Sequence, residues 1–224
     1  MAETLTSFTR VAVLTIATLM PLINPAGTAP IFLSLTNGET DHTRAVLSRR
    51  IARNTLITLV AAMVGGSWVL VLFGLSLAEI RIAGGLLVIA TAWHLMRTDQ
   101  RPDAAIVALS RVETAEPLAH SSFYPLTFPL TVGPGSVSIA ITLGAKAQAR
   151  GASTATELLA GLIGVVIVSL SVFLSYRFAS RLIAYLGETG TAVFLRLSSF
   201  ILLCIGVAII WSGLVELVQP LLAR

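Results

Sequence analysis

Long uncharged stretches separated by short polar clusters form the main pattern of this chain. A helix needs about 20 apolar residues to cross the hydrocarbon core of a bilayer. Five stretches without Asp, Glu, Lys or Arg meet or nearly meet that length, namely 11–38, 54–78, 117–145, 158–176 and 197–215. A sixth, 82–96, is short, but Arg81 and Arg97 at its ends can extend their charges toward the membrane surface. The pattern therefore predicts six membrane-spanning helices, at 11–36, 54–76, 80–97, 122–145, 157–178 and 195–216.

The composition supports a membrane protein and leaves little chain for a soluble domain. Hydrophobic residues make up 55% of the sequence and charged residues only 12%, too few to cover a soluble surface. The net charge of +4 does not indicate a nucleic-acid partner, because the basic residues fall between the predicted helices, as in the loops of membrane proteins. Cys204 is the sole cysteine, so no intrachain disulfide is expected.

The order of the predicted helices divides the chain into two halves. Three helices precede a polar stretch and three follow it, which gives a first repeat at 1–97, a linker at 98–121 and a second repeat at 122–224. An odd number of helices per half places the halves in opposite orientations. We therefore predict an all-α membrane protein of two inverted three-helix repeats.

The basic residues predict which loops face the cytoplasm. The loops after the first, third and fifth predicted helices hold ten of the 15 lysines and arginines. Cytoplasmic loops of membrane proteins are rich in these residues. We therefore expect the 98–121 linker in the cytoplasm and both termini on the other side of the membrane.

Two of the uncharged stretches are interrupted by proline and glycine at matching places, in the first and fourth predicted helices. Segments 21–28 and 129–136 both begin with Pro-Leu and both contain a glycine followed by a small hydroxyl residue. Interrupted helices at corresponding places in two halves point to the binding site of a secondary transporter. The candidate substrate-binding residues are Asn24, Pro25, Gly27, Thr28, Val132, Gly133, Pro134, Gly135 and Ser136. Simple proline kinks, which are common in membrane helices, are the structural alternative.

The interruptions leave backbone polar groups without helical partners at membrane depth. Such backbone is tolerated in a bilayer only against protein or a water-filled cavity. We expect Thr28 and Ser136 to cap the half-helices that follow, whose N-terminal N–H groups and dipoles favour a carboxylate. Carbonyl groups near Asn24 and Val132 suit an ammonium group or Na⁺. The predicted ligand is a small zwitterion between the two interruptions, for which Gly27 and Gly135 leave room.

The remaining polar residues indicate no catalytic or metal site. The three histidines lack the spacing of metal ligands, and the sequence contains neither a phosphate-binding glycine loop nor a recognisable hydrolase triad. We therefore expect no cofactor and rank an enzyme low. No acid lies in the middle of a predicted helix, so the coupling ion, Na⁺ or H⁺, stays open. We also expect an ion pair between Glu79 and Arg81, and close helix packing at Gly65 and Gly66.

Three motifs, in this order, resemble the MarC family of bacterial inner-membrane proteins. They are Asn-Pro-Ala-Gly at 24–27, Arg-Ile-Ala-Gly-Gly at 81–85, and the second interrupted segment at 129–136. The resemblance runs nearly the whole length of the chain. It implies a multi-pass protein of the bacterial inner membrane, with periplasmic termini by the arginine count. Members called SnatA resemble transporters of small neutral amino acids such as glycine and alanine.

The residues and the resemblance together favour a secondary transporter of small neutral amino acids that binds the zwitterion at the membrane midplane. A passive channel or facilitator for small solutes is the alternative, because the same broken helices could line a pore. The expected partners are the amino acid and the lipid bilayer. Nucleic acid is not expected, and a homo-oligomer stays open.

Overall fold

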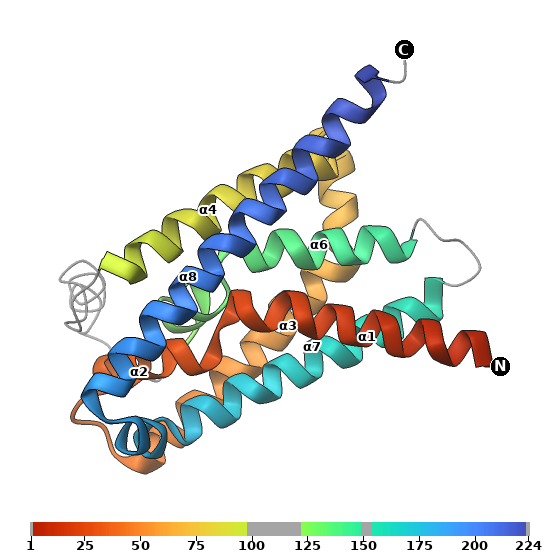
Figure 1. Ribbon diagram of the computed structural model, residues 1–224. Helices are drawn as coiled ribbons and strands as arrows, with labels where there is room; N and C mark the ends of the chain where they lie inside the picture. Colours follow the sequence, from red (N-terminus) through yellow and green to blue (C-terminus); the bar gives the residue numbers. More distant parts are fainter. Residues whose placement is uncertain (1, 98–121, 149–153, 223–224) are drawn as a thin grey trace.

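A computed structural model describes residues 2–97, 122–148 and 154–222 of the chain. These residues form an all-helical bundle without a sheet (Figure 1). The elements in chain order are α1 (Ala2–Ile23), α2 (Pro25–Leu35), α3 (Asp41–Phe73), α4 (Leu77–Arg97), η1 (Leu126–Thr131), α6 (Pro134–Gln148), α7 (Thr154–Arg177) and α8 (Ala179–Leu222). The predicted linker at 98–121 lies outside the described residues.

Five helical stretches are long and apolar enough to cross a membrane. They match the first, second, third, fifth and sixth predicted helices and comprise Thr6–Leu35, Asp41–Phe73, Leu77–Arg97, Ala155–Arg177 and Thr189–Gln219. The second begins well before the predicted residue 54, because its basic first turns are also helical. Thr40 caps this helix by accepting a hydrogen bond from the Thr43 N–H at 3.1 Å, and Asp41 in the first turn complements the helix dipole.

The fourth predicted helix, 122–145, is broken as expected and is not one of these five stretches. It divides into η1, a short wide-turn helix, and the 15-residue α6, with Val132 and Gly133 between them. Pro125, Pro129 and Pro134 explain the division, because proline has no N–H to donate to the preceding turn.

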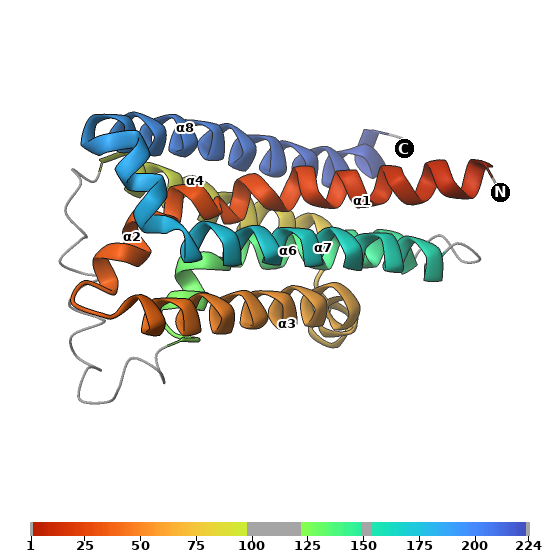
Figure 2. The same ribbon diagram turned by 90° about the horizontal axis from the view of Figure 1, so that it is seen from below.

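The polar junctions of the chain alternate between the two ends of the bundle. Both termini lie at one end, together with the α3–α4 junction and the C-terminal end of α6 (Figure 1, Figure 2). The α2–α3 junction, the C-terminal end of α4 and the α7–α8 junction lie at the opposite end. α8 changes direction at Gly187, whose φ of +67° is a backbone conformation that favours glycine. Its longer part then returns to the end that holds the termini.

Glycine allows α4 and α8 to approach closely. A Cβ added at Gly85 would lie 2.9 Å from the carbonyl oxygen of Gly206, and one added at Gly206 would lie 3.1 Å from that of Gly85. Gly66 is similarly tight, because its Cβ would lie 2.4 Å from the side chain of Ile141. Gly65 faces open space, so close packing is confirmed at Gly66 and wrong at Gly65.

The ion pair between α4 and α8 differs from the predicted one. Arg81 is 7% exposed and pairs with Glu216 of α8 rather than with Glu79. Glu79 instead accepts a hydrogen bond from the Ser76 N–H at 2.7 Å, at the exposed start of α4. Nearness in sequence suggested the wrong partner, because two residues apart is about half a turn of α4, so Arg81 points toward α8 and Glu79 points away from it.

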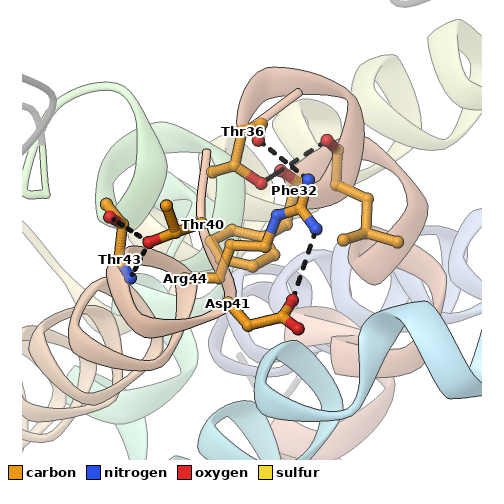
Figure 3. A network of polar contacts seen from close by, with 7 residues as sticks. Phe32, Thr36, Thr40, Asp41, Thr43 and Arg44 are labelled. Atoms are coloured by element: carbon orange, nitrogen blue, oxygen red, sulfur yellow. Dashed lines mark hydrogen bonds and ion pairs between the residues drawn. The ribbon is translucent and has the colours of Figure 1, made fainter. Parts of the chain in front are cut away.

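Arg44 fixes the junction between α2 and α3 (Figure 3). Its Nη2 donates to the carbonyl oxygen of Thr36 at 3.1 Å, and its Nη1 lies 3.8 Å from the Asp41 carboxylate. Thr36 is fully buried, and its N–H donates to the Phe32 carbonyl at 3.0 Å. The Arg44 cation also complements the dipole at the C-terminus of α2. These contacts hold the end of α2 in place, and the first interruption lies at the start of that helix.

Candidate functional site

A single residue interrupts the first broken helix. α1 ends at Ile23, α2 begins at Pro25, and Asn24 between them adopts the left-handed conformation with φ 44° and ψ 59°. Asparagine tolerates this conformation better than most residues. Its Oδ1 accepts a hydrogen bond from the Gly27 N–H at 3.2 Å. Asn24 is therefore the N-cap of α2, and the prediction that Thr28 is the cap was wrong.

At the first interruption, side chains form hydrogen bonds with the backbone of their own segment. The Thr28 hydroxyl donates back to the carbonyl oxygens of Asn24 at 3.1 Å and Pro25 at 3.3 Å. A Cβ added at Gly27 would lie 2.2 Å from the Nδ2 of Asn24. Glycine is therefore needed at this position because the capping side chain occupies the space beside it. Pro25, Gly27 and Thr28 are all buried, and Asn24 is partly exposed.

The second interruption is more extended. Val132 has the strand-like angles φ −108° and ψ 93°, and its N–H donates to the Thr127 carbonyl at 2.7 Å. The Ser136 hydroxyl donates to the carbonyl oxygen of Gly133 at 2.8 Å. Ser136 therefore lies inside the first turn of α6, which begins at Pro134, and the prediction that Ser136 is the cap was wrong. α6 starts three residues earlier than expected because proline suits the first helical position.

Gly135 packs against α4. A Cβ added there would lie 2.1 Å from the Cγ2 of Val88 and 3.2 Å from the carbonyl oxygen of Gly84. Its N–H has no acceptor among the described residues, whereas the N–H groups of Ser136 and Val137 both donate to the Gly133 carbonyl. The first turn of α6 therefore offers one unpaired backbone donor and the positive end of a helix dipole.

Tyr176 of α7 connects the two interrupted segments. Its hydroxyl lies 3.0 Å from the Thr28 Oγ1 and 2.8 Å from the Thr131 Oγ1, and all three groups are buried. The Tyr176 hydroxyl donates to Thr28, whose hydroxyl donates to the carbonyl oxygen of Asn24. The single proton of the Thr131 hydroxyl can go to the Tyr176 oxygen or to the carbonyl oxygen of Leu126 at 2.7 Å. The ring of Tyr176 stacks on Phe32 of α2, with centroids 4.6 Å apart and planes 7° from parallel. The two interruptions are thus brought together through a third helix.

A small pocket of about 80 Å³ lies beside the second interruption. The first turn of α6 forms one wall, including Gly133, Pro134, Gly135 and Ser136. α4 contributes Leu87, Val88 and Thr91, and the remaining walls come from η1, Leu22 and Leu202. Within residues 2–97, 122–148 and 154–222, no charged side chain lines this pocket. Four of the predicted site residues therefore line the pocket. The other five lie at the interruptions outside the lining, namely Asn24, Pro25, Gly27, Thr28 and Val132.

The residues that line the pocket include one with an unpaired backbone donor, Gly135, and the hydroxyl residues Thr91 and Ser136. The Gly135 N–H can donate to an anion, and the α6 dipole strengthens that contact. The hydroxyl groups of Thr91 and Ser136 donate to backbone carbonyls of their own segments, which leaves lone pairs to accept from a cation. Among the described residues, no group of three or more His, Cys, Asp or Glu side chains could hold a metal ion.

The residues around the site that sequence reasoning missed are Tyr176, Thr131 and Thr91. Tyr176 carries the one signal that could have been found, because it is the single aromatic hydroxyl in the uncharged stretch 158–176. A buried tyrosine hydroxyl usually has a hydrogen-bond partner, so its presence inside an apolar helix predicts a polar contact. Nothing in the sequence indicated which polar groups it would meet.

These features define a class: a polytopic α-helical membrane protein in which two interrupted helices meet in the core. The family model for the MarC family of integral membrane proteins matches residues 9–218. The chain belongs to the MarC family.

Relatives from different lineages match over nearly their whole length. A membrane protein of Bacillus subtilis called YvbG is 30% identical over 88% of this chain and 90% of its own. The inner membrane protein MarC of an Escherichia coli strain is 30% identical over 90% of this chain and 92% of its own. A membrane protein of Archaeoglobus fulgidus is 30% identical over 89% of this chain and 90% of its own. No solved structure matches the chain.

Proposed function

We propose that this protein is a secondary transporter of small neutral amino acids, and that it carries out no chemical reaction on them. The observation that supports the proposal best is the small pocket at the start of α6, whose lining residues include Gly135 with its unpaired N–H and the hydroxyl residues Thr91 and Ser136, and no charged residue among those described. A zwitterion brings both of its own charges, so it needs only dipoles of opposite sense to receive them. Without such dipoles, burial of the carboxylate and the ammonium group would cost free energy.

In the proposed binding mode the substrate lies across the pocket. The carboxylate accepts from the Gly135 N–H at the positive end of α6, and the ammonium donates to the oxygens of Thr91 and Ser136. The pocket holds only about 80 Å³ and is lined by Val88 and Leu202, which favours a substrate with a short side chain such as glycine or alanine. The coupling ion, Na⁺ or H⁺, is left to experiment.

We further propose six crossings in two inverted three-helix repeats. The packing of the helices supports this, because the main contacts of α3 and α4 have counterparts in the contacts of the corresponding helices α7 and α8. α3 packs on the fourth predicted helix, η1 with α6, as α7 packs on the first, α1 with α2, and α4 packs on α6 as α8 packs on α2. α3 with α7, and α4 with α8, then form the pairs between halves. Both termini lie at one end of the bundle, which is consistent with an even number of crossings (Figure 2).

An inverted repeat supplies a mechanism for alternating access. In such folds the two repeats exchange conformations as the site opens first to one side and then to the other. The second interruption now borders a pocket and the first is closed by its Asn24 cap. In the alternative state the first interruption would open and the second would close. Tyr176, which contacts both, would report the exchange by changing partners.

The proposed location is the bacterial inner membrane, as the name of the Escherichia coli relative states for that protein. The start of α3 carries a cluster of arginines, and Arg177 and Arg181 flank the α7–α8 junction, both at the end of the bundle opposite the termini (Figure 1). Positive residues favour the cytoplasm, so we place that end there and both termini in the periplasm.

The test is uptake of labelled alanine into proteoliposomes that contain the purified protein, with and without Na⁺ and proton gradients. Ion-driven accumulation above the external concentration supports a coupled transporter. Equilibration without accumulation would instead establish the passive channel, and no movement of alanine would reject both.

A pair of threonine variants tests the pocket in the same assay. Thr91→Val removes a hydroxyl from the pocket wall at nearly constant volume and should weaken alanine uptake. Thr18→Val is the matched control, because the Thr18 hydroxyl also donates to a carbonyl of its own helix, that of Leu14, but does not line the pocket. An equal loss of uptake in both variants would count against a role for Thr91 in binding.

A further inference from the structure

A second and larger pocket lies at the end of the bundle that holds the termini. Its volume is about 420 Å³, which falls in the range of small-molecule sites. It is formed by the start of α1, the end of α6, the start of α7 and Met63 of α3. It shares no lining residue with the pocket of about 80 Å³ beside the second interruption. The proposed transport mechanism does not use it.

The walls of this larger pocket change from polar to apolar along its depth. Arg10 lies in the first turns of α1, Lys146 in the last turn of α6, and Glu157 in the first turn of α7. These helix ends gather at one end of the bundle (Figure 1). Leu14 and Leu143 lie about one turn further from those ends and line the apolar part. A ligand that fits both parts has a charged head and an apolar tail.

The apolar part of the pocket is continuous with the surface that faces hydrocarbon. Leu14, which lines the pocket, is 48% exposed, and its neighbour Val13 is 56% exposed. Both belong to the candidate span Thr6–Leu35. Arg10 lies near the start of this span and Glu157 near the start of the span Ala155–Arg177, so we expect the charged part to lie close to the lipid headgroups. A lipid could therefore enter sideways, with its chain in the membrane and its head at the interface.

The charges specify the headgroup. Arg10 and Lys146 are exposed cations, and Glu157 is an acid that is only 6% exposed. Lys146 and Glu157 each have another interaction within the protein, but an ammonium has three donors and a carboxylate has about four acceptor positions. Two cations and one anion complement a head that has a phosphate and an ammonium group. A head with phosphate alone leaves Glu157 facing negative charge.

We propose that this pocket binds one phospholipid whose headgroup combines phosphate and ammonium, as in phosphatidylethanolamine. The phosphate contacts Arg10 and Lys146, the ammonium contacts Glu157, and one acyl chain lies over Leu14 and Leu143. Such a lipid links α1, α6 and α7 at one end of the bundle. The proposal is independent of transport, because it concerns binding at a separate place.

The first test is native mass spectrometry of the purified protein with phosphatidylethanolamine or phosphatidylglycerol. We expect the wild type to bind phosphatidylethanolamine at least fivefold more tightly. Glu157→Gln should remove this preference, and Arg10→Gln should weaken binding of both lipids. Arg53→Gln, at an exposed arginine of α3, is the control that should change neither. Equal binding of both lipids by the wild type would overturn the headgroup assignment.

A second variant leaves every charge in place and fills the apolar part of the pocket. Leu143→Trp should abolish the bound lipid, as well as the rise in melting temperature that added phosphatidylethanolamine causes in the wild type. Retention of the lipid by this variant would place it elsewhere. Stabilisation by free leucine and not by the lipid would reject a lipid site and assign the pocket to a soluble amphiphile.

Discussion

Tyr176→Phe tests whether the hydrogen bonds that join the two interruptions matter for stability and function. The substitution removes one oxygen and retains the ring that stacks on Phe32. Thr28 and Thr131 keep acceptors in their own segments, the carbonyl oxygens of Asn24 and Leu126, so no donor is left without a partner. The expected loss is therefore that of two hydrogen bonds and not that of two buried unsatisfied groups.

The expected magnitude follows from the two contacts of the Tyr176 hydroxyl. Hydrogen bonds between membrane helices contribute about 0.6 kcal/mol each on average, and typical protein hydrogen bonds about 1 kcal/mol. Two of them give a loss of about 1–2 kcal/mol, which changes the folded-to-unfolded ratio by about 5–30-fold. Transport should fall as well, because the hydroxyl is the direct link between the interrupted segments.

The assay for Tyr176→Phe combines denaturant unfolding of the purified protein with alanine uptake in proteoliposomes. Tyr185→Phe is the matched control, because Tyr185 is 90% exposed and makes no hydrogen bond among the described residues. Tyr176→Ala should cost about 3–5 kcal/mol, because it also removes the buried ring. A Tyr176→Phe protein with wild-type stability and wild-type uptake would refute the role of the bridge.

Three further substitutions test other parts of the account. Asn24→Ala removes the cap and puts alanine in a left-handed conformation, so it should lower the free energy of unfolding in denaturant by about 2 kcal/mol. Asn24→Gly should lower it clearly less, and equal losses would contradict the role of the backbone angle. Gly135→Leu should abolish alanine uptake and Gly65→Leu should not, because only Gly135 lacks space for a side chain; uptake by both variants would count against the site at α6. Glu216→Gln leaves the buried Arg81 without its anion and should lower the free energy of unfolding by about 2–3 kcal/mol. Adding Arg81→Met should recover part of that loss, and no recovery in the double variant would show that the pair is not coupled.

The sequence predicted the spans and the positions of the interruptions better than it predicted local contacts. An uncharged stretch of sufficient length identifies a membrane span. Pro25 and Pro134 mark the interruptions because proline cannot donate to the preceding turn, although Pro21 lies inside α1. The caps were misassigned because a hydroxyl at Thr28 or Ser136 can either cap a helix or donate to its own turn. At the first interruption Asn24 takes the cap, because its side chain accepts from the Gly27 N–H, and at the second Ser136 lies inside the first turn of α6.

Contacts between distant segments could not be predicted from the sequence. Arg81 was paired with its near neighbour Glu79, although its partner Glu216 lies 135 residues away. Tyr176 likewise meets Thr28 across 148 residues, and no pattern along the chain relates the two. The pocket beside α6 needs residues from several helices, so only the packed bundle shows that Thr91 belongs to it while Val132 does not.

The most direct test of the central claim is competition for alanine uptake by glycine, glycinamide and N-acetylglycine in proteoliposomes. Glycinamide lacks the carboxylate that the Gly135 N–H and the α6 dipole receive, and N-acetylglycine lacks the ammonium that Thr91 and Ser136 receive. We predict that glycine competes strongly and that each derivative competes at least tenfold more weakly, equivalent to about 1.4 kcal/mol. Equal competition by glycine and glycinamide would contradict recognition of the zwitterion at the start of α6.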